Sequence, residues 1–142
     1  MGRLTVNGID ALSDDFAALA RLPDSVIDGI LDAEAEVITA AQREEIEKQW
    51  RGPHSLGISA KSVKKGKAKK EKDGRSITVY PQGSRKRGGQ TTRNAEIAFI
   101  NEYGKRGQPA RPAISTANMK KEKEATDAGE RVYNQFLDSR NL

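Results

Sequence analysis

The sequence predicts an α+β fold, in which two long helices and a short helix pack on a small antiparallel β-sheet that carries a long basic hairpin. Three observations support this class. Apolar residues recur every three or four positions in one stretch near each end, the middle of the chain alternates in polarity and contains glycine turns, and 142 residues suit a single domain spanning 1–142. Because so few strands are marginally stable alone, we expect the helices to cover the apolar face of the sheet.

The first long helix is expected to take Asp24 or Ser25 as its N-cap and to run to about Trp50. Gly52-Pro53 then provides a strong stop signal. A shorter helix is expected before this long helix, near residues 13–21. The apolar positions of the long helix recur at spacings of three and four, and they are Val26, Ile30, Ala33, Val37 and Ala40.

Two strand-like segments flank a basic run in the middle of the chain. Residues 55–63 alternate in polarity, and residues 76–80 combine β-branched and aromatic side chains. The run KKGKAKKEKDG between them ends in Asp73-Gly74, a pair typical of hairpin turns, so we expect a β-hairpin with a long basic tip or basic arms. The next segment, PQGSRKRGGQTTR, is expected to form a second basic loop. Because residues 64–75 and 83–93 contain few apolar side chains, we expect both to be flexible basic loops.

A short helix is expected over residues 95–103, with Asn94 as its cap and Gly104 as its end. Its apolar side chains fall three positions apart, which suits one buried face. Glu96 and Glu102 on this helix are expected to face water or to form ion pairs with a neighbouring copy of the chain.

The last helix is expected to start near Pro112 and to end at about Asp138. Pro109 and Pro112 fix the extended connector that leads into it. Its apolar stripe is weakened at Lys121 and comprises Ile114, Ala117, Ala125, Ala128, Val132 and Phe136.

The net charge of +5 is unevenly distributed along the chain. Residues 1–50 carry 4 basic and 11 acidic side chains, whereas residues 51–111 carry 16 basic and 4 acidic ones. Such an asymmetry suggests two surfaces for two different partners, and head-to-tail contact between copies is one way to use it.

The cluster of basic side chains in the middle of the chain is the strongest physical signal. Such segments attract phosphate backbones without regard to sequence, but these runs lack the aromatic residues that stack on single-stranded bases. Three interpretations stay open: a solvated surface that keeps the protein soluble, weak contact with the DNA backbone, and docking on an acidic protein. The candidate contact residues are Lys61, Lys64, Lys65, Lys67, Lys69, Lys70, Lys72, Arg75, Arg85, Lys86, Arg87 and Arg93.

Catalytic and metal-binding patterns are missing from the sequence. The chain has no cysteine, and its single histidine, His54, has no second histidine with which to hold zinc. Ser55 and Ser59 lie near it without a nucleophile-elbow pattern. We therefore expect no enzyme activity and no cofactor. We also see no targeting segment and no apolar run long enough to span a membrane, so we expect a protein that does not contact membranes.

The segment AEIAFINEYGKRGQPARPAISTA, residues 95–117, contains two short motifs, Glu102-Tyr103-Gly104 and Ala110-Arg111-Pro112. It resembles the closing signature of the minor tail-component, or tail-completion, family of long-tailed lambdoid phages. In that family an apolar helix ends in a Glu-aromatic-Gly step, and an Ala-x-Pro motif leads into a C-terminal helix. Ala113 stands where the family usually has a bulky aromatic residue. The residues that carry the motif turn are Glu102, Tyr103, Gly104, Pro109, Ala110 and Pro112.

The resemblance implies a structural protein of the virion, located in the neck or tail. It would form a homo-oligomeric ring that joins head and tail, next to other neck proteins and tail-terminator or tail-tube proteins. DNA would pass through the ring, touching the basic loops weakly and without sequence preference. The alternative is a free DNA-binding protein without sequence preference. A toxin-type nuclease is a third class, and its candidate residues would be His54, Glu71 and Asp73.

Overall fold

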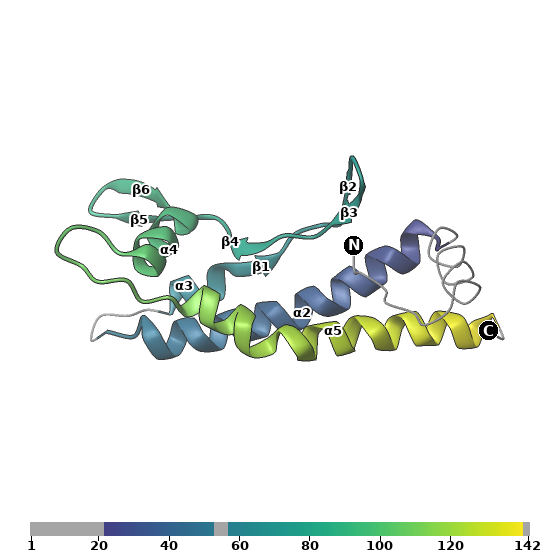
Figure 1. Cartoon of the computed structure of the whole chain (residues 1–142). Helices are drawn as coiled ribbons and strands as arrows, with labels where there is room; N and C mark the ends of the chain where they lie inside the picture. Colours follow the sequence, from purple (N-terminus) through teal and green to yellow (C-terminus); the bar gives the residue numbers. More distant parts are fainter. Residues whose placement is uncertain (1–21, 53–56, 141–142) are drawn as a thin grey trace.

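The structure is a computed structural model, which describes residues 22–52 and 57–140. Its framework is a pair of long antiparallel helices, α2 (Asp24–Gln49) and α5 (Ala113–Ser139), which lie side by side along their length (Figure 1). A β-ribbon lies over α2, and α4 (Asn94–Tyr103) lies at the end of the molecule where α5 begins. The fold is therefore α+β, as predicted.

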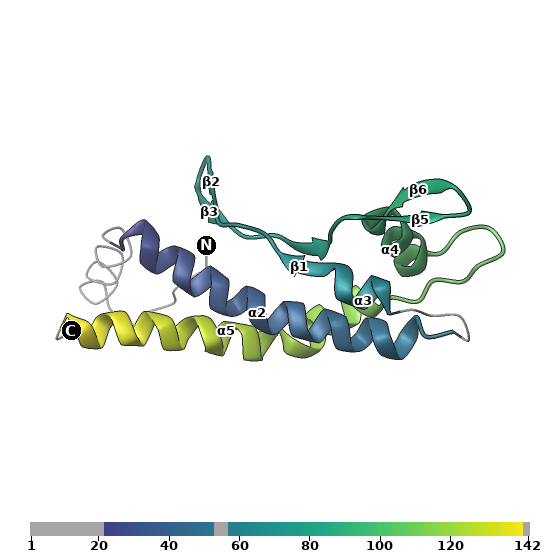
Figure 2. The ribbon, with the colours of Figure 1, turned by 180° about the vertical axis from the view of Figure 1, so that it is seen from behind.

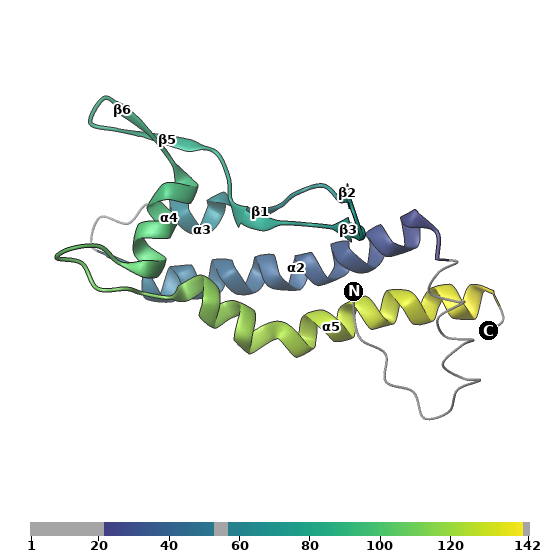
Figure 3. The same cartoon turned by 45° about the horizontal axis from the view of Figure 1, so that its top comes forward.

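The strands form three separate antiparallel pairs rather than one continuous sheet. β1 pairs with β4, with Val63 opposite Pro81, and the same ribbon continues into the β2–β3 hairpin (Figure 2). β5 and β6 form a second hairpin, which projects beside α4 (Figure 3). The strands are β1 (Val63–Lys65), β2 (Lys69–Glu71), β3 (Gly74–Ser76), β4 (Val79–Pro81), β5 (Ser84–Arg87) and β6 (Gln90–Arg93).

The core is small and lies where the end of α2, the ribbon, α4 and the start of α5 meet. Trp50 is its largest member, and the indole Nε1 donates a hydrogen bond to the backbone oxygen of Arg111 at 2.8 Å. Ala113, directly after Pro112, is fully buried in this cluster. The buried core residues are Ile46, Trp50, Ala60, Val63, Ala98 and Ala113.

Small residues bring α2 and α5 close together along the rest of the pair. Ala35, Ala125 and Ala128 are buried there, and a Cβ atom at Gly129 would come within 2.9 Å of Cγ of Glu34. Alanine and glycine allow close backbone approach but bury little apolar area each, so this half of the molecule has few large buried side chains.

Both predicted long helices are confirmed within one or two residues at their ends, but their caps differ from the prediction. Pro23, rather than Asp24 or Ser25, is the N-cap residue of α2, and Pro112 is the N-cap residue of α5. The short helix α4 ends at Gly104, as predicted, whereas Asn94 is its first residue rather than its cap. The helix expected over 13–21 lies outside the described residues.

The strand expected over 55–63 is wrong for residues 58–62, and residues 55 and 56 lie outside the described part of the chain. Residues Ile58–Ser62 form a short helix, α3, after Gly57 in a left-handed conformation (φ 70°), and only then does β1 begin. Ala60 and Ser62 are buried, because this helical turn packs its small side chains against neighbouring elements. Tertiary burial has here overridden a short alternating pattern.

The strand expected over 76–80 and the loop expected over 81–93 also differ from the structure. The first is divided between β3 and β4, with Ile77 and Thr78 between them. The second forms the paired strands β5 and β6. Gly88 and Gly89 have φ values of 59° and 83°, which is the backbone that a tight two-residue hairpin turn requires.

Candidate functional site

The β1–β4 ladder and the β2–β3 hairpin, residues 63–81, together form a ribbon that we call the basic arm. Its side chains alternate between two faces, as in any strand. Val63 and Pro81 are buried on the inner face, towards α2. Lys64 and Tyr80 lie opposite each other in the ladder and are exposed on the outer face. The arm therefore presents a cationic, partly aromatic surface away from the helices.

An acidic stripe on α2 faces the arm. Its members, Asp24, Asp28, Asp32 and Glu36, are spaced four residues apart and so lie along one side of the helix. Because the basic arm runs over this part of α2, carboxylates and cations separated in sequence meet in space.

Arg75 of the arm binds the N-terminal half of this stripe. Its guanidinium forms a bidentate pair with Asp28, in which Nη2 lies 2.9 Å from Oδ2 and Nε donates to Oδ1, and it also lies 3.6 Å from the carboxylate of Asp24. The side chain of Arg75 is only 18% exposed. The hydrogen bonds to Asp28 raise the pKa of Arg75 further, so its guanidinium remains charged at any physiological pH.

Lys65 binds the second half of the stripe. Its Nζ lies 2.7 Å from Asp32 and 3.2 Å from Glu36, and the hydrogen bond to Asp32 is the main cause of its raised pKa. Two of the predicted contact residues, Lys65 and Arg75, are therefore neutralised within the chain. We call these two ion-pair groups the latch. These ion pairs within the chain balance part of the charge difference between the acidic residues 1–50 and the basic residues 51–111, which the sequence did not predict.

The other lysines of the arm are exposed, and within the described part of the chain their ammonium groups make no ion pair or hydrogen bond. Glu71, one of the two acids nearby, accepts a hydrogen bond from the hydroxyl of Ser76 at 2.9 Å. Lys61, at the end of α3 just before the arm, is exposed as well. We use the name arm lysines for Lys64, Lys67, Lys69, Lys70 and Lys72.

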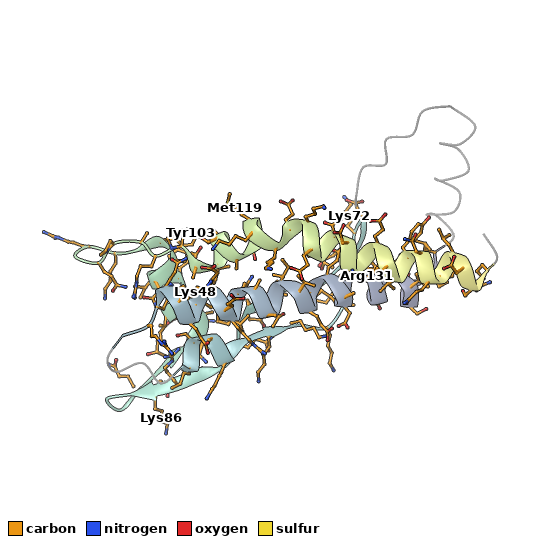
Figure 4. All side chains as sticks on the ribbon, turned by 90° about the horizontal axis from the view of Figure 1, so that it is seen from below. Lys48, Lys72, Lys86, Tyr103, Met119 and Arg131 are labelled. Carbon is orange, nitrogen blue, oxygen red and sulfur yellow. The ribbon has the colours of Figure 1, made fainter. Side chains whose placement is uncertain are left out.

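The basic residues of the second segment, residues 83–93, lie outside the basic arm and differ from one another in their contacts. Arg85 binds Asn94 Oδ1 and Ser59 Oγ, both at 2.8 Å, and so ties the β5–β6 hairpin to α3 and α4. Arg93 lies 3.1 Å from Glu96 in an exposed pair. Lys86 projects from the hairpin (Figure 4). The side chain of Arg87 lies outside the described residues. Of the predicted residues in this segment, only Lys86 is an exposed cation without an ion-pair partner among the described residues.

Glu102 is the residue whose role the sequence analysis missed. It is 5% exposed and neither faces water nor pairs with a cation in the described chain. Its carboxylate accepts hydrogen bonds from the backbone N–H groups of Ile114 (2.9 Å) and Ser115 (2.8 Å), and from the Ser115 hydroxyl (2.6 Å). It therefore caps the first turn of α5, where free N–H groups favour an anion.

Gly104 lies directly after α4, at the start of the connector that leads to α5. Its φ of 78° is disfavoured for other residues, and a Cβ atom would lie 2.8 Å from the backbone of both Gln108 and Ala110. The backbone N–H of Arg111 then donates to the oxygen of Asn101 at 2.7 Å. The Glu-aromatic-Gly and Ala-Arg-Pro motifs are thus the two sides of one structural corner, which sets how α5 leaves α4.

Two large aromatic side chains are exposed on the outer side of α4. Phe99 is 64% exposed and Tyr103 is 67% exposed, and their ring centroids lie 4.8 Å apart. We call them the aromatic pair. Spaced four residues apart, they stack along one face of the helix, and nothing in the described chain covers that face.

An open groove of about 570 Å³ lies between α2, α5 and the stretch of the arm around Ile77. Gln42 at its wall is 2% exposed, and although its amide nitrogen donates to Asn118 at 2.9 Å, its Oε1 has no hydrogen-bond partner among the described residues. Burial raises the pKa of Glu34, another lining residue. The apolar residues of the groove are Leu31, Ala35, Ile38, Ile77, Val79, Met119 and Ala125.

No family model, characterised protein or solved structure matches this chain.

The described residues contain no group of three or more His, Cys, Asp and Glu side chains able to hold a metal ion. His54 falls within residues 53–56, which the structure does not describe. Among the described helices, none has the length and apolar character that crossing a bilayer requires. The described surfaces are suited to contact with macromolecules: the basic arm, the aromatic pair and the groove.

Proposed function

We propose that this chain is the subunit of a ring that completes a phage tail or joins it to the head, with DNA passing through the ring. In a ring each subunit must meet two neighbours through two unlike surfaces, because the contacts run head to tail. A lumen that conducts DNA also needs a third surface, one whose contacts with phosphate are weak.

The observation that carries this proposal is the separation of three exposed surfaces on one small chain. The aromatic pair lies on α4, the apolar groove lies between the helices and the arm, and the exposed arm lysines lie along the arm itself. Large exposed apolar patches indicate protein contacts in solution. The small core fits the same view, since a subunit that gains burial from its neighbours needs less of its own.

The resemblance of residues 95–117 supports the same assignment. Its two motifs form the buried corner around Glu102 and Gly104, so they have a physical reason to occur together. That corner fixes the direction of α5 relative to α4. In an assembled ring, such a corner would hold the aromatic pair at a constant position on each subunit.

The test is the mass of the purified protein by light scattering, across a concentration series at low and high salt, followed by electron microscopy of the largest species. We expect growth with concentration towards one closed oligomer, seen as a ring. Apolar contacts survive high salt, so assembly should persist there. A chain that stays monomeric at every concentration, alone and with tail proteins added, would contradict the proposal.

A free DNA-binding protein is the second candidate, and the arm lysines favour it. A monomer that neutralises several phosphates would show an affinity that falls steeply with salt, with a slope of about −0.9 per contact on a log–log plot. A monomer with submicromolar affinity at 0.15 M salt would support this candidate over the ring. Weak binding that disappears at that salt concentration fits a lumen that lets DNA pass.

A further inference from the structure

We propose that the aromatic pair on α4 of one copy of this chain docks into the apolar groove of the next copy, and that this contact is what joins neighbouring subunits. The inference rests on the proposed ring. It adds to the ring the identity of the two surfaces that meet, and it makes the contact heterologous rather than self-complementary.

The aromatic pair has the size and shape of an anchor. Phe99 and Tyr103 are, with Tyr80 and Met119, the large apolar side chains that the described chain leaves exposed. Two adjacent rings on one helix form a compact projection. Aromatic side chains are the type most often found as anchors at the centre of protein interfaces.

The groove has the complementary properties. Its walls come from α2, α5 and the arm, and Met119 at its rim is 78% exposed (Figure 4). Among its lining groups, Gln42 Oε1 has no donor within the described chain, which is unusual for a buried polar atom. Because this oxygen is itself closed off from solvent, the apolar walls and the exposed rim of the groove form the complement to the aromatic pair.

Charge complementarity selects a second copy as the occupant. The charged residues that line the groove are Glu34 and Glu122, and neither forms an ion pair in the described part of the chain. The loop directly after Tyr103 carries Lys105 and Arg106, both exposed and likewise unpaired among the described residues. Insertion of the aromatic pair would bring these cations to the acidic wall, where burial already disfavours the charge of Glu34.

The same charges disfavour interfaces in which two identical surfaces meet. Two α4 helices meeting face to face would bring Lys105 and Arg106 of both copies together, and two grooves would bring their glutamates together. Like charges at an interface disfavour that pairing. Unlike surfaces therefore meet, as a head-to-tail ring requires.

The expected strength of a single contact is modest. Two aromatic side chains supply about 300–500 Å² of buried area, which is less than the roughly 800 Å² per partner of a standard interface. Assembly should therefore depend on concentration and be reinforced by ring closure, in which every subunit makes two contacts.

Cross-linking tests this arrangement cleanly, because the chain has no cysteine of its own. We would make Tyr103→Cys and Met119→Cys as separate proteins, both at exposed positions, and treat them with a short thiol–thiol cross-linker. We expect covalent dimers when the two proteins are mixed and few with either protein alone. The matched control is Arg131→Cys, an exposed position about three turns further along α5, which should not cross-link to Tyr103→Cys.

Two outcomes of that experiment would overturn the inference. Equally strong cross-linking of Tyr103→Cys to itself would mean that α4 pairs with α4. Protection of the Met119→Cys thiol in a dilute, monomeric sample would mean that another segment of the same chain fills the groove.

A second measurement separates this inference from the proposed function. The double variant Phe99→Ser/Tyr103→Ser should need at least a ten-fold higher concentration to assemble, whereas Tyr80→Ser, an exposed aromatic residue on the arm, should assemble like the parent. Circular dichroism would show that the variants remain folded. If the double variant assembles normally, the inference is wrong and the ring stands. If the parent never assembles, the ring itself is wrong and the inference falls with it.

Discussion

At the scale of single residues, Glu102 has the most specific role in the structure, since one buried carboxylate satisfies two backbone N–H groups at the start of α5. In Glu102→Ala these donors lose their partner in a place that water reaches poorly. We expect a loss of about 1–3 kcal/mol of stability, read as a lower midpoint in urea or thermal unfolding. Glu96→Ala on the exposed side of the same helix is the control and should change stability by less than about 0.5 kcal/mol. Equal effects of the two substitutions would contradict the capping role.

Glu34 gives a prediction about pH. Because burial raises its pKa, the folded state is penalised when this carboxylate is ionised, and the penalty is present in full above the folded pKa. Below the unfolded pKa of about 4.3, both states are protonated and the penalty vanishes. We therefore expect Glu34→Gln to unfold at a higher temperature than the parent at pH 7, with the difference shrinking towards pH 4.

The comparison should be made at protein concentrations where both proteins are monomeric, since a neighbour's cations would otherwise compensate the charge. Glu122→Gln, which removes an exposed carboxylate from the same groove, serves as the control. A difference in unfolding temperature that grows as the pH falls would have the wrong sign and would contradict the effect of burial on the pKa of Glu34.

At the scale of elements, the latch decides how the basic arm lies on α2. We predict that Arg75→Gln will speed amide hydrogen exchange in residues 69–76 several-fold, because the hairpin loses its bidentate anchor on Asp28. Global stability should change little, as is usual for partly exposed ion pairs. Asp28→Asn should have the same local effect, and the two substitutions together should be no worse than either alone.

Lys70→Gln is the matched control for the latch, because Lys70 faces Arg75 across the hairpin and has no ion-pair partner in the described chain. Its removal should leave exchange unchanged or slow it, since like charges directly opposite each other destabilise a strand pair. Unchanged exchange in Arg75→Gln would mean that the ladder hydrogen bonds alone hold the arm.

Elements with long periodic patterns were predictable from the sequence, and short ones were not. α2 and α5 each combine a helical apolar period with a proline just before the start, so their bounds follow from local chemistry. The region of α3 holds only one helical turn, whose conformation depends on burying Ala60 and Ser62. In the β5–β6 hairpin, the basic charge concealed a recognisable signal, two adjacent threonines after Gly88-Gly89.

The candidate site was predictable in composition but not in detail. The sequence identified the basic residues as a group, yet it could not separate Arg75 and Lys65 from the arm lysines. That separation depends on contacts with Asp28 and Asp32, far away in the chain. The exposure of the aromatic pair was likewise not foreseen, because helical spacing alone does not say which face a tertiary neighbour covers.

At the scale of the whole molecule, the charges form a pattern with a consequence for DNA. The latch pairs the four carboxylates of the acidic stripe on α2 with two cations, and this leaves the arm lysines without nearby acids to oppose them, apart from Glu71 and Asp73. Since their ammonium groups make no ion pair or hydrogen bond in the described part of the chain, their charge is available to a partner and contributes little to the fold.

We therefore predict that replacing all five arm lysines with glutamine will preserve the fold and weaken DNA binding. The circular dichroism spectrum and unfolding midpoint should match those of the parent, while the log–log slope of affinity against salt should become shallower by about 0.9 for every phosphate that the variant no longer neutralises. Lys69→Gln changes a single lysine of the arm. Its matched control is Lys123→Gln, which changes a single exposed lysine on α5. Loss of secondary structure would show that the arm needs these lysines to fold. An unchanged slope would remove DNA binding from the role of the arm without affecting the ring, and would leave a solvated surface or docking on an acidic protein as that role.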